Sequence, residues 1–106
     1  MYPKPLEIIC YHCQQSAEKM LKCAMIYYGE NINKTHDLGL LAEACQRYFE
    51  VSEEYLDMCD ELTPYSVRIR YPQELYIEER HAKNAVDYAN KIFSLINSVL
   101  DIDNIK

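Results

Sequence analysis

Residues 5–28 read PLEIICYHCQQSAEKMLKCAMIYY and carry the clearest structural pattern in the chain. Apolar and small side chains recur there at steps of three and four residues, at Leu6, Cys10, Cys13, Ala17, Leu21, Ala24 and Tyr28. This spacing places them on one face of a helix. Pro5 suits a first helical turn, where its missing N–H costs nothing. Gly29 suits a left-handed cap at the other end. We therefore predict one long helix over this stretch.

The rest of the chain predicts further helices joined by short connections. Residues 30–35 are polar and read as a loop, and a second helix is expected over about 37–49. A third helix follows over about 52–62, with Ser52 as its N-cap. The last helix, over about 78–100, has an unbroken apolar stripe that includes Val86 and Phe93. We predict an all-α fold, an up-and-down helical bundle in which neighbouring helices are mostly antiparallel.

One segment between the third and last helices is ambiguous. Thr63 followed by Pro64 is typical of a new helix start. Residues 67–71 alternate like a half-buried strand but also fit one or two helical turns. A lone strand would have no pairing partner, so we favour a helix or an extended linker. Pro72 ends the segment, because the residue before a proline is pushed out of the α region.

Length, charge and cysteine usage narrow the classes of protein. The 106 residues fit a single domain spanning 1–106, and the two glycines and four prolines argue against a turn-rich β fold. A net charge of −6 disfavours sequence-independent binding of nucleic acid. No apolar run is long enough to cross a bilayer. Five cysteines without an export signal predict reduced thiols in a cytoplasmic protein.

Few side chains suggest chemistry. Cys10 and Cys13 form a C-x-x-C pair, but no further ligands complete a metal site, so we expect buried thiols and no metal. No glycine-rich phosphate loop exists, and no cofactor is expected. Glu18 and Lys22 have the spacing of an ion pair on one helix. His36 lies at a loop-to-helix junction, where Thr35 or Asp37 could cap the helix while His36 bonds to a neighbouring one.

Three stretches together resemble the HEPN domain family (higher eukaryotes and prokaryotes nucleotide-binding). They are QQSAEKMLK at 14–22, KTHDL at 34–38 and RYP at 70–72, in family order on a helical background. The resemblance covers nearly the whole chain. It implies a helical bundle that commonly forms a homodimer. It also implies a prokaryotic setting, often beside a minimal nucleotidyltransferase in a toxin–antitoxin or accessory pair.

The chain departs from the RNA-cleaving members of this family. Those members carry an arginine followed four to six residues later by a histidine, a pair that stabilises phosphate charge and moves protons. None of the four arginines here, Arg47, Arg68, Arg70 and Arg80, has a histidine at that distance. We therefore carry over no catalytic residue and expect a non-catalytic module that acts by protein association, with a nucleotide or RNA near the interface.

Candidate residues for contact with a ligand, RNA or a partner share charge, aromaticity or a motif position. They are Arg68, Arg70, Tyr71, Arg80, His81, His36, Glu18 and Lys22. The alternative function is a divergent, metal-independent HEPN ribonuclease toxin that uses Arg70, Arg80 and His81. A local basic patch could form from Arg68, Arg70, Arg80 and Lys83, although a solvated helix face of mixed charge is the simpler interpretation.

A second departure concerns the start of the chain. Members of this family usually have an extra helix before the one that carries the QQ-x-AEK motif, and here Met1 lies almost at the start of that helix. We therefore expect one flank of it, including Ile8, Ile9 and Cys23, to lack cover within the chain. Self-association or another protein would then hide this surface.

Overall fold

The structure is a computed structural model that describes residues 5–31, 34–66 and 77–100. Its regular elements there are all helical: α1 (Pro5–Tyr27), α2 (Leu38–Cys45), α3 (Glu53–Leu62), the 3-10 helix η1 (Thr63–Ser66) and α4 (Glu79–Leu100). The predicted all-α class is confirmed. The ambiguous 67–71 segment lies outside the described residues. None of the helices within the described ranges is long and apolar enough to span a bilayer.

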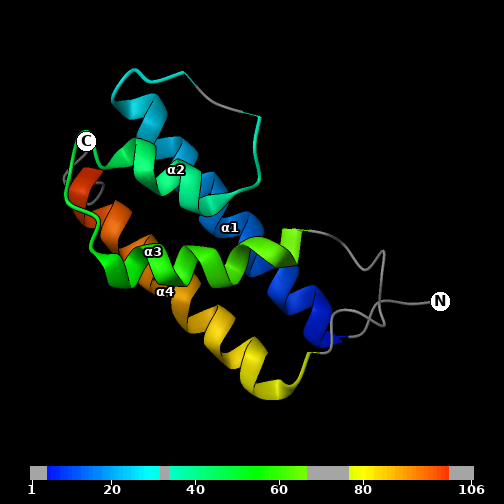
Figure 1. Ribbon diagram of the computed structural model, residues 1–106. Coiled ribbons are helices and arrows are strands. Elements are labelled where there is room, and N and C mark those ends of the chain that lie inside the picture. The colour runs from blue at the N-terminus through cyan, green and yellow to red at the C-terminus, as the bar shows by residue number, and fades with distance from the viewer. Residues whose placement is uncertain (1–4, 32–33, 67–76, 101–106) are drawn as a thin grey trace.

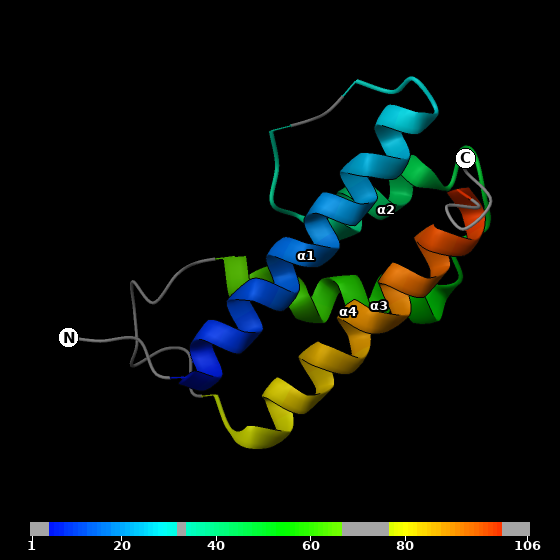
Figure 2. The ribbon, with the colours of Figure 1, turned by 180° about the vertical axis from the view of Figure 1, so that it is seen from behind.

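The two long helices, α1 and α4, lie side by side and run in the same direction (Figures 1 and 2). Near the start of both helices, Leu6 and Ile9 of α1 line one groove with Ala82 of α4. Further along the two helices, Ser16 of α1 and Ala89 of α4 line a second groove. The α3 helix runs the opposite way to both α2 and α4 (Figures 1 and 2), whereas the antiparallel arrangement predicted for neighbouring helices does not hold for α1 against α4 or α2. The α2 helix runs in the same sense as α1, because the connection after α1 is long enough to return along it.

Capping explains where α1 ends and α2 begins. Gly29 has a φ of +83°, the left-handed cap that was predicted. Its N–H donates to the Ile26 carbonyl at 3.0 Å, and the N–H of Glu30 donates to the Met25 carbonyl at 2.8 Å, which is the double bond of a Schellman motif. Asp37 caps α2 through its side chain, which accepts from the Leu40 N–H at 3.3 Å.

Two boundaries differ from the sequence prediction. The α2 helix ends at Cys45, short of residue 49. Thr63 begins the 3-10 helix η1, as its sequence with Pro64 predicted, but it does so as the right-handed helical C-cap of α3 and not as an extended N-cap. Its hydroxyl accepts from the Leu38 N–H at 3.0 Å and donates to the Cys59 carbonyl at 2.8 Å. Thr63 thus joins the start of α2 to the end of α3.

The core lies where α1 meets the other helices. Its largest fully buried apolar side chains come from each of the four α-helices: Leu21, Met25, Leu38, Leu41, Leu62, Ile92 and Ile96. The buried residues of α1 follow the predicted face, with Cys10, Ala17, Leu21 and Ala24 almost fully covered. Burial raises the pKa of Cys10 to about 11, so this thiol stays protonated and packs as a small apolar side chain.

Candidate functional site

Glu18 is a buried carboxylate at the middle of α1, only 6% exposed. Three side chains reach it. His36 Nδ1 lies 2.8 Å from Oε1, and Gln14 Nε2 donates to the same oxygen at 3.2 Å. Lys22 Nζ, one turn along α1, donates to Oε2 at 2.9 Å. Since an ionised carboxylate only accepts hydrogen bonds, His36 Nδ1 carries a proton in this contact.

These contacts keep Glu18 ionised. Burial alone raises the pKa of Glu18, but the hydrogen bonds from His36, Lys22 and Gln14 together outweigh it and hold the pKa below its ordinary value. A carboxylate whose pKa is lowered by three donors is a poor general base, because it binds a proton weakly. The cluster is therefore suited to holding structure, not to abstracting protons.

The same cluster holds the connection between α1 and α2 against α1. Gln14 is fully buried, and its amide also donates to the backbone carbonyl of His36 at 3.0 Å. The Thr35 hydroxyl accepts from the Asp37 N–H at 3.1 Å, just before Asp37 caps α2. The His36 side chain remains 66% exposed. The sequence predictions for Glu18, Lys22 and His36 thus meet at one place, where His36 is the exposed member.

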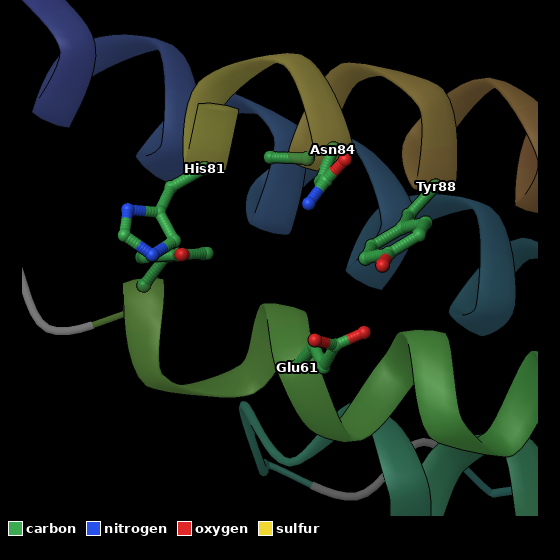
Figure 3. Close-up of a pocket in the computed structure, with 6 residues that line it drawn as sticks. Glu61, His81, Asn84 and Tyr88 are labelled. Carbon is green, nitrogen blue, oxygen red and sulfur yellow. The ribbon is translucent and has the colours of Figure 1, made fainter. Parts of the chain in front are cut away.

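A second region surrounds His81 (Figure 3). A cavity of about 110 Å³ lies between the end of α3, η1 and the first turns of α4. Its lining is mixed polar and aromatic: Glu61, Tyr65, His81, Asn84, Ala85 and Tyr88. Figure 3 shows His81, Asn84 and Tyr88 spaced along α4, with Glu61 facing them from α3. His81 Nδ1 accepts from the Glu78 N–H at 2.9 Å.

The described residues do not assemble an arginine–histidine pair. Arg80 directs its Nε to Glu78 Oε1 at 2.8 Å, and His81 bonds to the backbone of the same Glu78. Arg68, Arg70 and Tyr71 lie outside the described residues. Within the described ranges, no group of three or more His, Cys, Asp or Glu side chains could hold a metal ion.

The third region is an exposed apolar face along α1 and α4. Four large side chains on it are 39–49% exposed: Ile8, Ile9, Val86 and Phe93. We call this set the α1–α4 face. Two shallow apolar grooves run across it, one between His12, Ser16 and Asn90 and the other between Leu6 and Lys83. Cys23 is also exposed. The prediction that Ile8, Ile9 and Cys23 lack cover within the chain is confirmed for the described residues.

Comparison with protein families agrees with this architecture. The model of the HEPN domain family matches residues 3–99. The chain belongs to the HEPN family. The match spans all the helices and both stretches that supply the Glu18 cluster, residues 14–22 and 34–38. No curated protein and no solved structure gave a match.

The HEPN resemblance identified part of the site but not all of it. It selected Glu18, Lys22 and His36, which the structure brings together, and His81, which the structure places in a cavity. It gave no signal for Glu61 or Tyr88, because each is an isolated polar residue on an ordinary helix face. The apolar stripe of α4 did include Val86 and Phe93 but did not show that they would be exposed.

Proposed function

We propose that this HEPN protein is a non-catalytic module that acts by protein association, and that the α1–α4 face binds a second copy of the chain. The observation that carries the proposal is the exposure of Ile8, Ile9, Val86 and Phe93 on two adjacent helices. Covering such a face removes apolar surface from water, which stabilises the complex by roughly 25 cal/mol for each Å² buried.

A second copy fits this face for two reasons. In a dimer with two-fold symmetry, the same apolar patch on each copy covers the patch on the other, so no second kind of surface is needed. HEPN domains often dimerise. The charges at the rim also permit close approach. Lys83, beside the groove, is paired with Glu79 on the same helix at 3.8 Å. The rim is thus locally neutral, although the whole chain carries a charge of −6.

The wider role that we propose is that of an accessory subunit in the cytoplasm. The dimer would serve a minimal nucleotidyltransferase or a toxin–antitoxin pair, with a nucleotide or RNA near the interface. Support comes from family membership and from the five free thiols. The ribonuclease alternative receives no support from the contacts of Arg80 and His81, since both are engaged with Glu78.

Size-exclusion chromatography with light scattering tests the association. At micromolar concentration the chain should have twice its single-chain mass. Phe93→Ser combined with Val86→Ser should shift it to the monomer, because both side chains are about half exposed and their loss leaves the core intact. Leu40→Ser is the matched control, since Leu40 is 52% exposed on α2, away from the face.

Two results would contradict the proposal. A monomeric wild-type chain over this concentration range would remove its basis. Dissociation by Leu40→Ser, with Val86→Ser/Phe93→Ser unchanged, would place the interface elsewhere. Circular dichroism of each variant confirms that the helices remain folded.

A further inference from the structure

The cavity between α3, η1 and α4 contains a carboxylate with no cationic partner among the described residues. Glu61 is in none of the ion pairs of the described ranges. The nearest cations in sequence on α4 are already used: Arg80 pairs with Glu78 and Lys83 with Glu79. The interaction of the Tyr88 hydroxyl with the Glu61 carboxylate raises the pKa of Tyr88. Glu61 is exposed, and no cation of the described ranges neutralises its carboxylate.

Aromatic rings form the walls around this carboxylate. Tyr65, His81 and Tyr88 line the cavity together with Glu61 (Figure 3). Tyr65 is half-buried. Burial raises the pKa of Tyr65, and the negative charge of Glu61 adds to this effect. Aromatic faces next to a carboxylate attract a cation through both the ring quadrupole and the charge.

The hydrogen-bonding groups also favour a donor-rich ligand. The carboxylate of Glu61 offers lone pairs on two oxygens, and the carboxamide of Asn84 can supply a further acceptor oxygen. His81 accepts at Nδ1 from the Glu78 N–H, so in the neutral ring the proton lies on Nε2, and this donor does not add to the attraction for a cation. A phosphate or carboxylate would meet the charge of Glu61 and be repelled.

The size of the cavity limits what can enter. One water needs roughly 10–15 Å³ of such space, so about 110 Å³ holds several waters or one small head group. A planar guanidinium or an alkylammonium group fits this space, whereas a whole nucleotide does not.

We propose that the cavity lined by Glu61, Tyr65, His81, Asn84 and Tyr88 binds a guanidinium or alkylammonium group. The group would come from an arginine or lysine side chain of a partner protein or from a free polyamine. The proposal does not rest on the dimer. Residues 81, 84 and 88 lie on one side of α4, at spacings of three and four, and Val86 and Phe93 lie on another.

An NMR titration of the full-length, ¹⁵N-labelled chain tests this site. The probes are capped arginine (N-acetyl-arginine-N-methylamide) and spermidine, each against sodium chloride at matched ionic strength. We expect saturable shifts of the amides of His81, Asn84 and Tyr88 with at least one probe. Glu61→Gln should weaken that binding about tenfold, as loss of a charge-assisted hydrogen bond does. Glu53→Gln, which removes the same charge at the start of α3, should change it less than about twofold.

The two probes distinguish the sources of the cation. Tighter binding of capped arginine supports a protein side chain, and tighter binding of spermidine supports a free polyamine. Tyr88→Leu is a second variant that keeps the carboxylate but removes an aromatic wall, and it should weaken binding about threefold. Shifts that merely follow ionic strength, or equal binding by wild type and Glu61→Gln, would overturn the site.

Discussion

Glu18 is the residue on which the connection between α1 and α2 depends. A buried charge is costly unless it is paired and hydrogen-bonded. Here Lys22 supplies the charge from the same helix, while His36 and Gln14 supply donors from the returning loop and from α1. Removing the charge would leave these donors without their acceptor. The cluster therefore stabilises the loop as much as it stabilises Glu18.

Glu18→Gln should lower the free energy of unfolding at pH 7 by about 2 kcal/mol, since a carboxamide cannot accept all three donors. Because the folded pKa of Glu18 lies below its ordinary value of 4.5, the unfolded chain binds this proton first as the pH falls. The stabilisation is therefore complete above about pH 4.5 and is lost as the pH falls through the folded pKa.

Urea unfolding at pH 7, 5, 4 and 3 checks this prediction. The difference between wild type and Glu18→Gln should narrow below pH 4.5. Glu43→Gln is the control, because Glu43 is exposed on α2, and its stability should follow the wild type. A gap that stays constant over this pH range would show that the Glu18 charge is not what stabilises the cluster.

At the scale of the element, the end of α1 depends on one backbone conformation. Gly29 has a positive φ, and nothing lies within 4 Å of the position where a Cβ would be. Any cost of a side chain at this position is therefore backbone strain and not a clash. Next to Gly29, the ring of Tyr28 stacks on the ring of Tyr48, with their centroids 4.7 Å apart. This stacking holds the end of α1 to the turn after α2.

Gly29→Ala should destabilise the fold by about 1 kcal/mol, the usual cost of a left-handed conformation for a residue with a Cβ. Gly29→Asn should cost less, because asparagine tolerates this conformation better. Thermal and urea unfolding of both variants give the comparison. Equal stability of wild type and Gly29→Ala would show that the Schellman cap contributes nothing to α1.

Helices were predictable from the sequence where local signals decide them. The period of α1, the glycine after it and the Ser52 start of α3 are all local. The start of η1 at Thr63 was also signalled locally, but the bond that the Thr63 hydroxyl accepts from the N–H of Leu38, 25 residues away, was not. No local pattern could show that contact. The early end of α2 likewise depends on tertiary contacts of the turn after Cys45, where Tyr48 stacks on Tyr28.

At the scale of the whole molecule, the sequence indicated which surfaces are apolar but not which of them stay open. Ile8 and Ile9 were expected to lack cover, and among the residues that the structure describes none covers them fully. Val86 and Phe93 belong to the same apolar stripe of α4 as Ile92. Ile92 lies on the edge of the stripe that is buried, whereas Val86 and Phe93 lie on the edge that stays exposed. The cavity at Glu61 was not predictable, because it forms only when α3 and α4 come together.

The most direct measurement of the central claim is an isotope-filtered NOE experiment on a mixed sample. Equal amounts of ¹³C-labelled and unlabelled chain report only contacts between copies. The account predicts intermolecular NOEs from the methyl groups of Ile8, Ile9 and Val86 and from the ring of Phe93. It predicts none from the exposed methyl groups of Leu40 on α2. The account would be contradicted by a sample with no intermolecular NOEs, or by NOEs that centre on Leu40 and avoid the α1–α4 face.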